Sequence, residues 1–178
     1  MMRLIKHRFL SVCLTFIAGF HGLVWAECDT SVPATTPDAR FTIERASSTV
    51  KDLHTGLTWQ RCALGEVWSG DTCTIDDAQA GLFLWSEALA AAQTQTGWRL
   101  PNKKELASII EYQCRLPALN RALFPPAQQA SEDQRYWSST PLVYFSQPTV
   151  WVIDFADGAF ANSAADARLK VRLVKGSL

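Results

Sequence analysis

The sequence lacks the residue spacings that mark the commonest catalytic and metal sites. It has no CxxC pair, and His54 is the one histidine beyond the first 26 residues, so no zinc site is expected. It also has no Gly-x-Ser-x-Gly elbow that could join His54 in a hydrolase triad. Internal repeats and low-complexity tracts are absent. These absences favour an ordinary globular domain that needs neither a metal nor a cofactor.

Charge of one sign is not in excess either, because 17 Lys and Arg face 17 Asp and Glu. Three of the basic residues, Arg3, Lys6 and Arg8, precede an apolar run from Phe9 to Val24. This pattern predicts a signal peptide over residues 1–26, cleaved after Ala26. The competing interpretation is a membrane anchor, but the run is shorter than the ~20 apolar residues of a spanning helix. We therefore expect a periplasmic or extracellular protein with no membrane span after cleavage.

The exported part has 152 of the 178 residues, enough for one core that buries about 70% of the unfolded surface. It keeps fourteen basic residues against seventeen acidic ones, which gives a net charge of −3. Nucleic acid is therefore not an expected partner.

Four cysteines remain after cleavage, an even number that is typical of two disulfides in an oxidising compartment. Three pairings are possible. The turn-forming residues between Cys62 and Cys73 favour a bridge between these two, which leaves Cys28 with Cys114. In the loop-entropy model the two bridges contribute roughly 3 and 4 to 5 kcal/mol. A catalytic cysteine is not expected when every thiol is paired.

The order of turn and apolar residues predicts the organisation of the exported part. Residues 27–40 are rich in proline, serine and threonine and predict an extended N-terminal arm, and residues 41–178 predict the folded domain. Within the domain, strands near Val50 and over residues 57–59 are joined by a turn that contains Gly56. We expect a hairpin there.

Two helices are the clearest regular elements. Residues 86–95 are rich in alanine and are followed by Gly97, which can end a helix. A second helix is expected after Asn102, which can cap it, while Glu105 closes a capping box. Its apolar stripe consists of Leu106, Ile109 and Ile110.

The last part of the chain alternates between apolar and polar residues, as antiparallel strands do. We expect strands over residues 136–138, 150–155 and 168–174, with a turn at Asp157-Gly158 between the last two. Helices in the first half and strands in the second predict an α+β fold and not a parallel sheet.

Eight short motifs occur in one order over residues 50–176: Asp52-x-x-Thr55-Gly56-Leu57-x-Trp59-Gln60-Arg61-Cys62, Trp68 with Cys73, Trp85-x-x-Ala88-Leu89, Gly97-Trp98-Arg99-Leu100-Pro101-Asn102-x-x-Glu105-Leu106, Pro117-Ala118-x-Asn120, Phe124-Pro125, Tyr136-Trp137-Ser138-Ser139 and Val171-Arg172-Leu173-Val174. Together they resemble the Lcl C-terminal domain family, long catalogued as a domain of unknown function. The resemblance implies a C-type-lectin-like fold, related to formylglycine-generating enzymes, in which a twisted antiparallel sheet is flanked by two helices. In one departure, Arg45-Ala46-Ser47-Ser48 replaces the usual turn rich in Asp and Gly before the first strand.

Exposed aromatic and basic side chains are the candidate ligand contacts. The basic residues alternate along the last predicted strand and could meet an acidic polymer, although a solvated face that discourages edge pairing is the favoured interpretation. Arg99, in contrast, is expected to be structural, with its fork bound to a carboxylate or to backbone carbonyls. The candidate contacts are Trp68, Tyr144, Phe145, Arg168, Lys170 and Arg172.

Other acidic and calcium sites receive little support. Asp154 and Asp157 could act as an acid–base pair, but Asp157-Gly158 is an ordinary turn dipeptide. The calcium site of C-type lectins needs an acidic residue in its first loop, which residues 147–149 lack, and an asparagine in its second, which residues 151–154 lack. We therefore expect no catalytic residue and no metal ligand.

These observations favour a non-catalytic binding or adhesion module of the bacterial envelope, which recognises a glycan or a protein through long loops at 63–83, 123–135 and 141–149. The resemblance supports this function, since one family member ends a collagen-like adhesin that binds sulfated glycans. One alternative is a structural accessory of an assembly such as a flagellum or a pilus. Another is an enzyme related to formylglycine-generating enzymes, which use cysteines.

Overall fold

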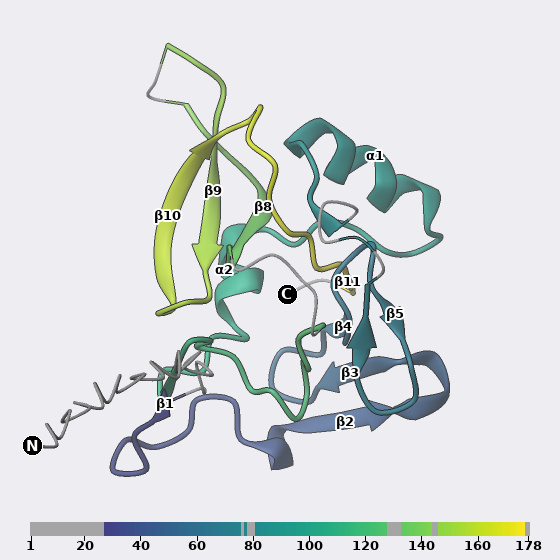
Figure 1. Cartoon of the computed structure of the whole chain (residues 1–178), viewed down its shortest axis with the longest axis vertical. Coiled ribbons are helices and arrows are strands. Elements are labelled where there is room, and N and C mark those ends of the chain that lie inside the picture. Colours follow the sequence, from purple (N-terminus) through teal and green to yellow (C-terminus); the bar gives the residue numbers. More distant parts are fainter. Residues whose placement is uncertain (1–26, 76, 78–80, 128–132, 144–145, 177–178) are drawn as a thin grey trace, which may run out of the picture.

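Two antiparallel sheets and two α-helices form most of the fold (Figure 1). The computed structural model describes residues 27–75, 77, 81–127, 133–143 and 146–176. One sheet has the strand order β11-β4-β3-β2 and the other the order β10-β9-β8, while β1 pairs with β7 and β5 with β6. The expected α+β class with two helices and two disulfides is confirmed. The strands are β1 (Glu27–Cys28), β2 (Phe41–Glu44), β3 (Thr49–Asp52), β4 (Thr58–Gln60), β5 (Val67–Trp68), β6 (Cys73–Thr74), β7 (Cys114–Arg115), β8 (Arg135–Leu142), β9 (Thr149–Asp154), β10 (Ala159–Ala164) and β11 (Val174–Lys175).

The helices form where their local sequence signals predict them. Helix α1 covers Trp85–Thr94 and buries Ala88 and Ala92. Helix α2 covers Lys103–Ala107 and begins at the predicted cap, because the side chain of Asn102 accepts bonds from two backbone N–H groups and Glu105 closes the box. The predicted apolar stripe of Leu106, Ile109 and Ile110 is buried, although α2 ends before Ile109 and Ile110.

Hairpins build the first sheet. The predicted hairpin between β3 and β4 is confirmed, and Gly56 in its turn has a φ of 76° that favours glycine. Sequence analysis missed β2, which pairs with β3 through a turn at Arg45–Ser47 that places Ser48 at a φ of 48°. Both hairpins bring polar residues to one edge of the molecule, where the candidate site lies.

The second sheet differs from the sequence prediction at its last strand. The turn at Asp157-Gly158 leads into β10, which pairs with β9 along residues 159–164. A regular strand over 168–174 was the wrong prediction, since this segment makes isolated bridges at Leu169 and Lys170 before β11 begins. The segment runs between the two sheets and joins the edge of the first sheet only at its end, where Val174 begins β11 (Figure 1).

The described residues form two main hydrophobic clusters. The first contains Trp59 and Phe124, and the second contains Trp137. The segment from Leu169 to Val174 contributes to both, because Leu169, Val171 and Leu173 belong to the second cluster and Val174 belongs to the first. No helix in the described ranges has the length and apolar character to cross a bilayer.

Both predicted disulfide pairings are confirmed. Cys28 is bonded to Cys114, where β1 pairs with β7, and Cys62 is bonded to Cys73, where β6 begins. The first bridge joins residues 86 positions apart and fastens the N-terminal arm to the domain. The second fastens the β5–β6 ribbon to the chain just after β4.

Candidate ligand-binding site

Trp68 lies on the β5–β6 ribbon with one ring face covered from inside the protein. The guanidinium of Arg61 lies 4.2 Å from the ring centroid. Arg61 is itself fixed, because its side chain is 6% exposed and donates to the carbonyls of Ala122 and Leu123. A cation on the inner face of an indole stabilises its position and leaves the rest of the half-buried ring for contact.

A hollow of about 460 Å³ lies between Trp68 and Trp98. Trp98 follows helix α1 and is half-buried against the second hydrophobic cluster. The ammonium of Lys175, on the exposed end of β11, lies 5.0 Å from the centroid of its ring. We call this feature the Trp68–Trp98 hollow; it combines two indoles with a solvent-accessible cation.

Side-chain amides and hydroxyls line the same hollow. Gln60 on β4 donates to Gln95 after α1 at 2.8 Å, which uses one donor of the first amide and one lone pair of the second. Ser47 and Ser48, from the turn between β2 and β3, also line it. The hollow therefore offers several further donors and acceptors at short range beside aromatic faces.

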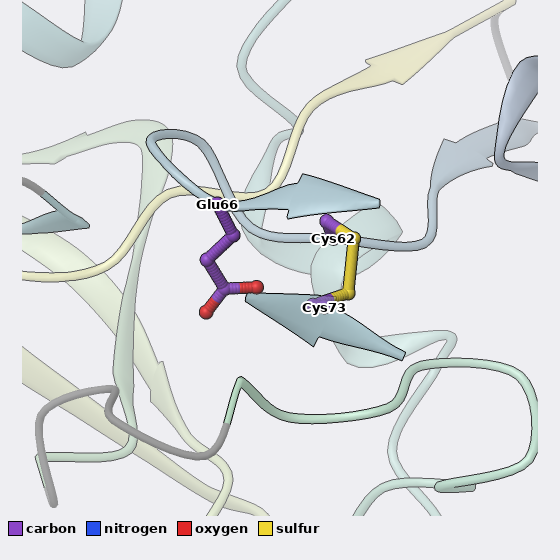
Figure 2. Close-up of side chains that lie close together, drawn as sticks. All are labelled: Cys62, Glu66 and Cys73. Carbon is purple, nitrogen blue, oxygen red and sulfur yellow. A yellow bond between two sulfur atoms is a disulfide. The ribbon is translucent and has the colours of Figure 1, made fainter. Parts of the chain in front are cut away.

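The disulfide Cys62–Cys73 lies beside Glu66, and Figure 2 shows these three side chains together. Their ligand atoms lie within 4.8 Å of one another, a spacing that could suit a metal ion. The two sulfurs, however, are bonded to each other in a disulfide. A cysteine binds a metal ion as a thiolate, so neither sulfur can act as a ligand in this form. The carboxylate of Glu66 accepts a bond from the backbone N–H of Ala63 at 2.8 Å. With the disulfide formed, this cluster has a structural role: it joins β6 to the chain after β4 beside the hollow.

The predicted basic face is wrong for two of its three residues. Lys170 is 5% exposed and Arg172 is 2% exposed. The guanidinium of Arg172 lies over Phe124 and Tyr136 and donates to the carbonyls of Gln60 and Arg61. These cations are buried because their segment runs between two clusters and so has no solvated side. Neither side chain is placed to meet a ligand at the surface.

Replacing Lys170 with methionine should stabilise the protein. Burial lowers the pKa of Lys170, even though Glu66 and Asp133 attract its charge. Its ammonium lies 5.9 Å from the centroid of the Tyr136 ring. We expect Lys170→Met to raise the free energy of unfolding by about 1–3 kcal/mol, measured by urea denaturation near neutral pH. An equal or lower stability would mean that the buried ammonium has a compensating partner.

The remaining predicted residues have separate positions. Arg168 is exposed and pairs with Glu87 at 3.0 Å. Tyr144 and Phe145 lie outside the described residues. The structural role predicted for Arg99 is confirmed, because its fork donates to both carboxylate oxygens of Glu105 at 2.6 and 2.7 Å. Of the predicted contact residues that the structure describes, Trp68 alone lines the Trp68–Trp98 hollow.

The polar residues weighed for catalysis lie in local turns. The backbone N–H of His54 donates to Asp52. Asp154 and Asp157 each accept a bond from the backbone N–H two residues further on, from Ala156 and Ala159. Such bonds are typical of aspartate in turns. They favour a structural role in turns over an acid–base pair.

Sequence reasoning missed Trp98 and Lys175 as site residues. In the sequence, Trp98 stands in a family motif just before the start of α2, which does not mark it as a ligand contact. The isolated bridge between Arg99 and Val174 brings Trp98 close to Lys175. The two are far apart in the sequence, and no spacing pattern predicts this contact. A lysine directly after the apolar end of a strand was the one available signal.

Comparison with known protein families identifies the family of this chain. No curated protein matches the chain. The model of the Lcl C-terminal domain matches residues 48–175, which include both tryptophans of the hollow and the Cys62–Cys73 bridge. The match covers well over half of the chain and agrees with the motifs identified in the sequence. The chain therefore belongs to the Lcl C-terminal domain family.

Proposed function

We propose that this protein is an exported, non-catalytic binding module of the bacterial envelope that holds acidic glycans in the Trp68–Trp98 hollow. The observation that carries the proposal is the hollow itself, in which two indoles, a pair of amides and an exposed ammonium converge. Its volume of about 460 Å³ falls in the usual range of ligand pockets, roughly 300–1,000 Å³.

The lining suits a sugar. A pyranose presents apolar C–H faces and a rim of hydroxyls, so it needs flat aromatic surfaces next to short-range donors and acceptors. Trp68 and Trp98 supply the surfaces, while Gln60 and Gln95 supply the amides. Lys175 adds a positive charge, which favours a sugar that carries a carboxylate or a sulfate.

The exposed apolar surface suits a protein partner less well. Protein interfaces depend on clustered aromatic or aliphatic anchors at their centre. The large exposed apolar residues among those described are scattered along the chain, and none of them lines the hollow. They are Val32, Leu53, Val67, Tyr112, Leu116, Val143 and Phe160.

Export and a lectin-like relationship are part of the same proposal. Disulfides persist in oxidising compartments, and both bridges are consistent with an extracytoplasmic domain. The charged and apolar segments of residues 1–26 support a cleaved signal peptide. Two helices beside antiparallel sheets support a relationship to the C-type-lectin fold.

A binding measurement with two variants tests the proposal. Trp68→Ala should weaken binding to an acidic glycan by about 30-fold or more, the effect of truncating a central aromatic anchor. The matched control is Phe160→Ala, an exposed aromatic on β10 outside the hollow, which should bind like the wild type. Lys175→Gln should reduce the salt dependence of binding, because one cation is removed. Isothermal titration at two salt concentrations measures all three.

The outcome separates the proposal from its alternatives. Equal binding by Trp68→Ala and Phe160→Ala would place the ligand elsewhere and overturn it. If the protein binds none of the glycans on an array, a structural accessory with a protein partner would be favoured. A free thiol detected by titration of the unfolded protein would favour an enzyme related to formylglycine-generating enzymes, since that chemistry needs a reactive sulfhydryl.

A further inference from the structure

The Cys62–Cys73 bridge and the carboxylate of Glu66 form one compact cluster at the base of the β5–β6 ribbon (Figure 2). The two cysteines are 11 residues apart in the sequence, and Glu66 lies between them. Two sulfurs and a carboxylate oxygen lie within 4.8 Å of one another. Thiolates and carboxylates are both zinc ligands, so this cluster becomes a set of three ligands when its sulfurs are reduced.

The backbone around the cluster is held by bonds that do not depend on the disulfide. Just after Cys62, the N–H of Leu64 donates to the carbonyl of Val171 at 2.8 Å. Cys73 pairs with Trp68 in the β5–β6 ribbon. Reduction therefore leaves the two cysteines opposite each other. A rotation of their side chains then gives the separation of about 3.8 Å that two thiolates have on one tetrahedral zinc ion.

Glu66 is already oriented as the third ligand. One oxygen of its carboxylate accepts from the backbone N–H of Ala63 at 2.8 Å, and the N–H of Glu66 donates to the carbonyl of Ala63 at 3.0 Å. Carboxylates that bind metal ions in proteins usually accept such a second bond, which fixes their direction. A carboxylate has about four lone-pair sites, so this bond leaves others for a cation.

Cations near the cluster suit its charge. Two thiolates and a carboxylate carry three negative charges, of which a divalent ion neutralises two. The buried ammonium of Lys170 is attracted by Glu66, and the guanidinium of Arg61 lies over Trp68 on the same ribbon. Positive charge nearby also favours the thiolate over the thiol, and the thiolate is the form that binds metal ions.

We propose that reduction of the Cys62–Cys73 bridge by a dithiol creates a site for one divalent cation of the zinc class, which both thiolates and Glu66 hold. The inference goes beyond the proposed function and does not rest on it. The dithiol is oxidised to its own disulfide as the protein disulfide becomes two thiols. The cation then displaces the two thiol protons, which go to water.

The Trp68–Trp98 hollow gives access to this site. Three protein ligands leave the fourth position of a tetrahedral zinc ion open, as in zinc sites that bind water or a substrate. Cys62 and Glu66 both line the hollow, so the cation and its water ligand enter from that side.

Titration of the reduced protein with cobalt(II) tests the inference, because cobalt replaces zinc and absorbs strongly when thiolates bind it. The full chain is reduced with dithiothreitol, which is then removed under nitrogen. We expect one cobalt ion per chain, with sulfur-to-cobalt charge-transfer absorption that added zinc abolishes. The oxidised protein should show no such absorption. Reduced protein without thiolate absorption would overturn the inference.

Glu66→Gln is the decisive variant. Glutamine still accepts the bond from the N–H of Ala63 through its amide oxygen, so the loop keeps its fold, but its neutral amide is a poor zinc ligand. We expect cobalt affinity to fall by about tenfold or more, the least that loss of a ligand should cost. The matched control is Glu44→Gln at an exposed position, which should bind like the wild type. Equal affinities of the two variants would remove Glu66 from the site and contradict the inference.

The other bridge shows whether the site is specific. Replacing both Cys28 and Cys114 by serine should leave cobalt binding by the reduced protein unchanged, because these thiols lie in the β1–β7 pair. Replacing both Cys62 and Cys73 by serine should abolish it. Zinc should also raise the thermal midpoint of the reduced wild type by several degrees, as a ligand of the folded state does. If either serine variant binds cobalt as well as the other, or if zinc leaves the midpoint unchanged, the inference is wrong.

Discussion

Asp52→Ala is expected to lower the free energy of unfolding by about 3–5 kcal/mol, the usual cost of removing one partner from a buried ion pair. Asp52 is fully buried at the end of β3. Its carboxylate accepts from Nε and Nη2 of Arg40, from the backbone N–H of His54 and from the hydroxyl of Thr55. Burial opposes the charged form, but these bonds outweigh it and lower the pKa of Asp52.

Urea denaturation measures this loss, and Asp71→Ala is the matched control. Asp71 lies exposed in the β5–β6 turn, so its truncation should change stability by no more than about 0.5 kcal/mol. Comparable losses in both variants would show that the bonds to Asp52 contribute no more than an exposed aspartate does. Because Asp52 closes the hairpin that carries Gln60, the variant should also weaken glycan binding.

Glu111→Gln is expected to lower the free energy of unfolding by about 3 kcal/mol and to loosen the N-terminal arm around Thr36, while the Cys28–Cys114 bridge still holds the start of the arm. Glu111 is 3% exposed, and its two oxygens accept from the backbone N–H groups and hydroxyls of Thr35 and Thr36 and from the N–H of Gln113. Glutamine would direct an NH₂ group at some of these donors and leave them unpaired in a buried place. Hydrogen exchange at Thr36 and denaturation report the two effects, with the exposed Glu44→Gln as control.

The same carboxylate makes stability depend on pH. Burial raises the pKa of Glu111, but the bonds from Thr35, Gln113 and Thr36 bring it below its ordinary value of 4.5. Its stabilising contribution is complete above that value and is lost as the pH falls through the lower pKa of the folded state. Wild-type protein should therefore lose stability below about pH 4.5, and Glu111→Gln should lose less over that window. Equal losses of stability in the wild type and in Glu111→Gln below pH 4.5 would contradict a stabilising role of the Glu111 carboxylate.

The parts of the fold that depend on local sequence could be predicted. Asn102 and Glu105 are three residues apart and satisfy each other's backbone groups, so they identify the start of α2 without any distant contact. Gly56 likewise identifies the turn between β3 and β4. The loop between Cys62 and Cys73 is short and rich in turn formers, which made their pairing predictable.

The environment of the segment at 168–174 could not be predicted from its pattern. Basic and apolar residues that alternate are usually found on strands with one solvated face. Here the alternating apolar residues enter the second cluster, while Lys170 lies over the ring of Tyr136. Arg172 lies over the rings of Phe124 and Tyr136. Aromatic faces replace water around both charges, and backbone carbonyls also do so around Arg172. No spacing rule reveals such an environment.

The candidate site was predictable at one residue. Trp68 stands in a loop rich in turn formers, and such aromatic residues are often accessible. Trp98 and Lys175 are 77 residues apart, and the bridge between Arg99 and Val174 brings them together. The hollow therefore arises from tertiary pairing, for which the sequence alone holds no local signal.

The segment from Leu169 to Val174 also determines when the molecule becomes complete. Because its side chains lie in both clusters, neither cluster is complete until residue 174 has been synthesised. Trp98 and Lys175 likewise become neighbours only after the bridge between Arg99 and Val174 has formed. The Trp68–Trp98 hollow is therefore assembled only after nearly all of the family domain has been made.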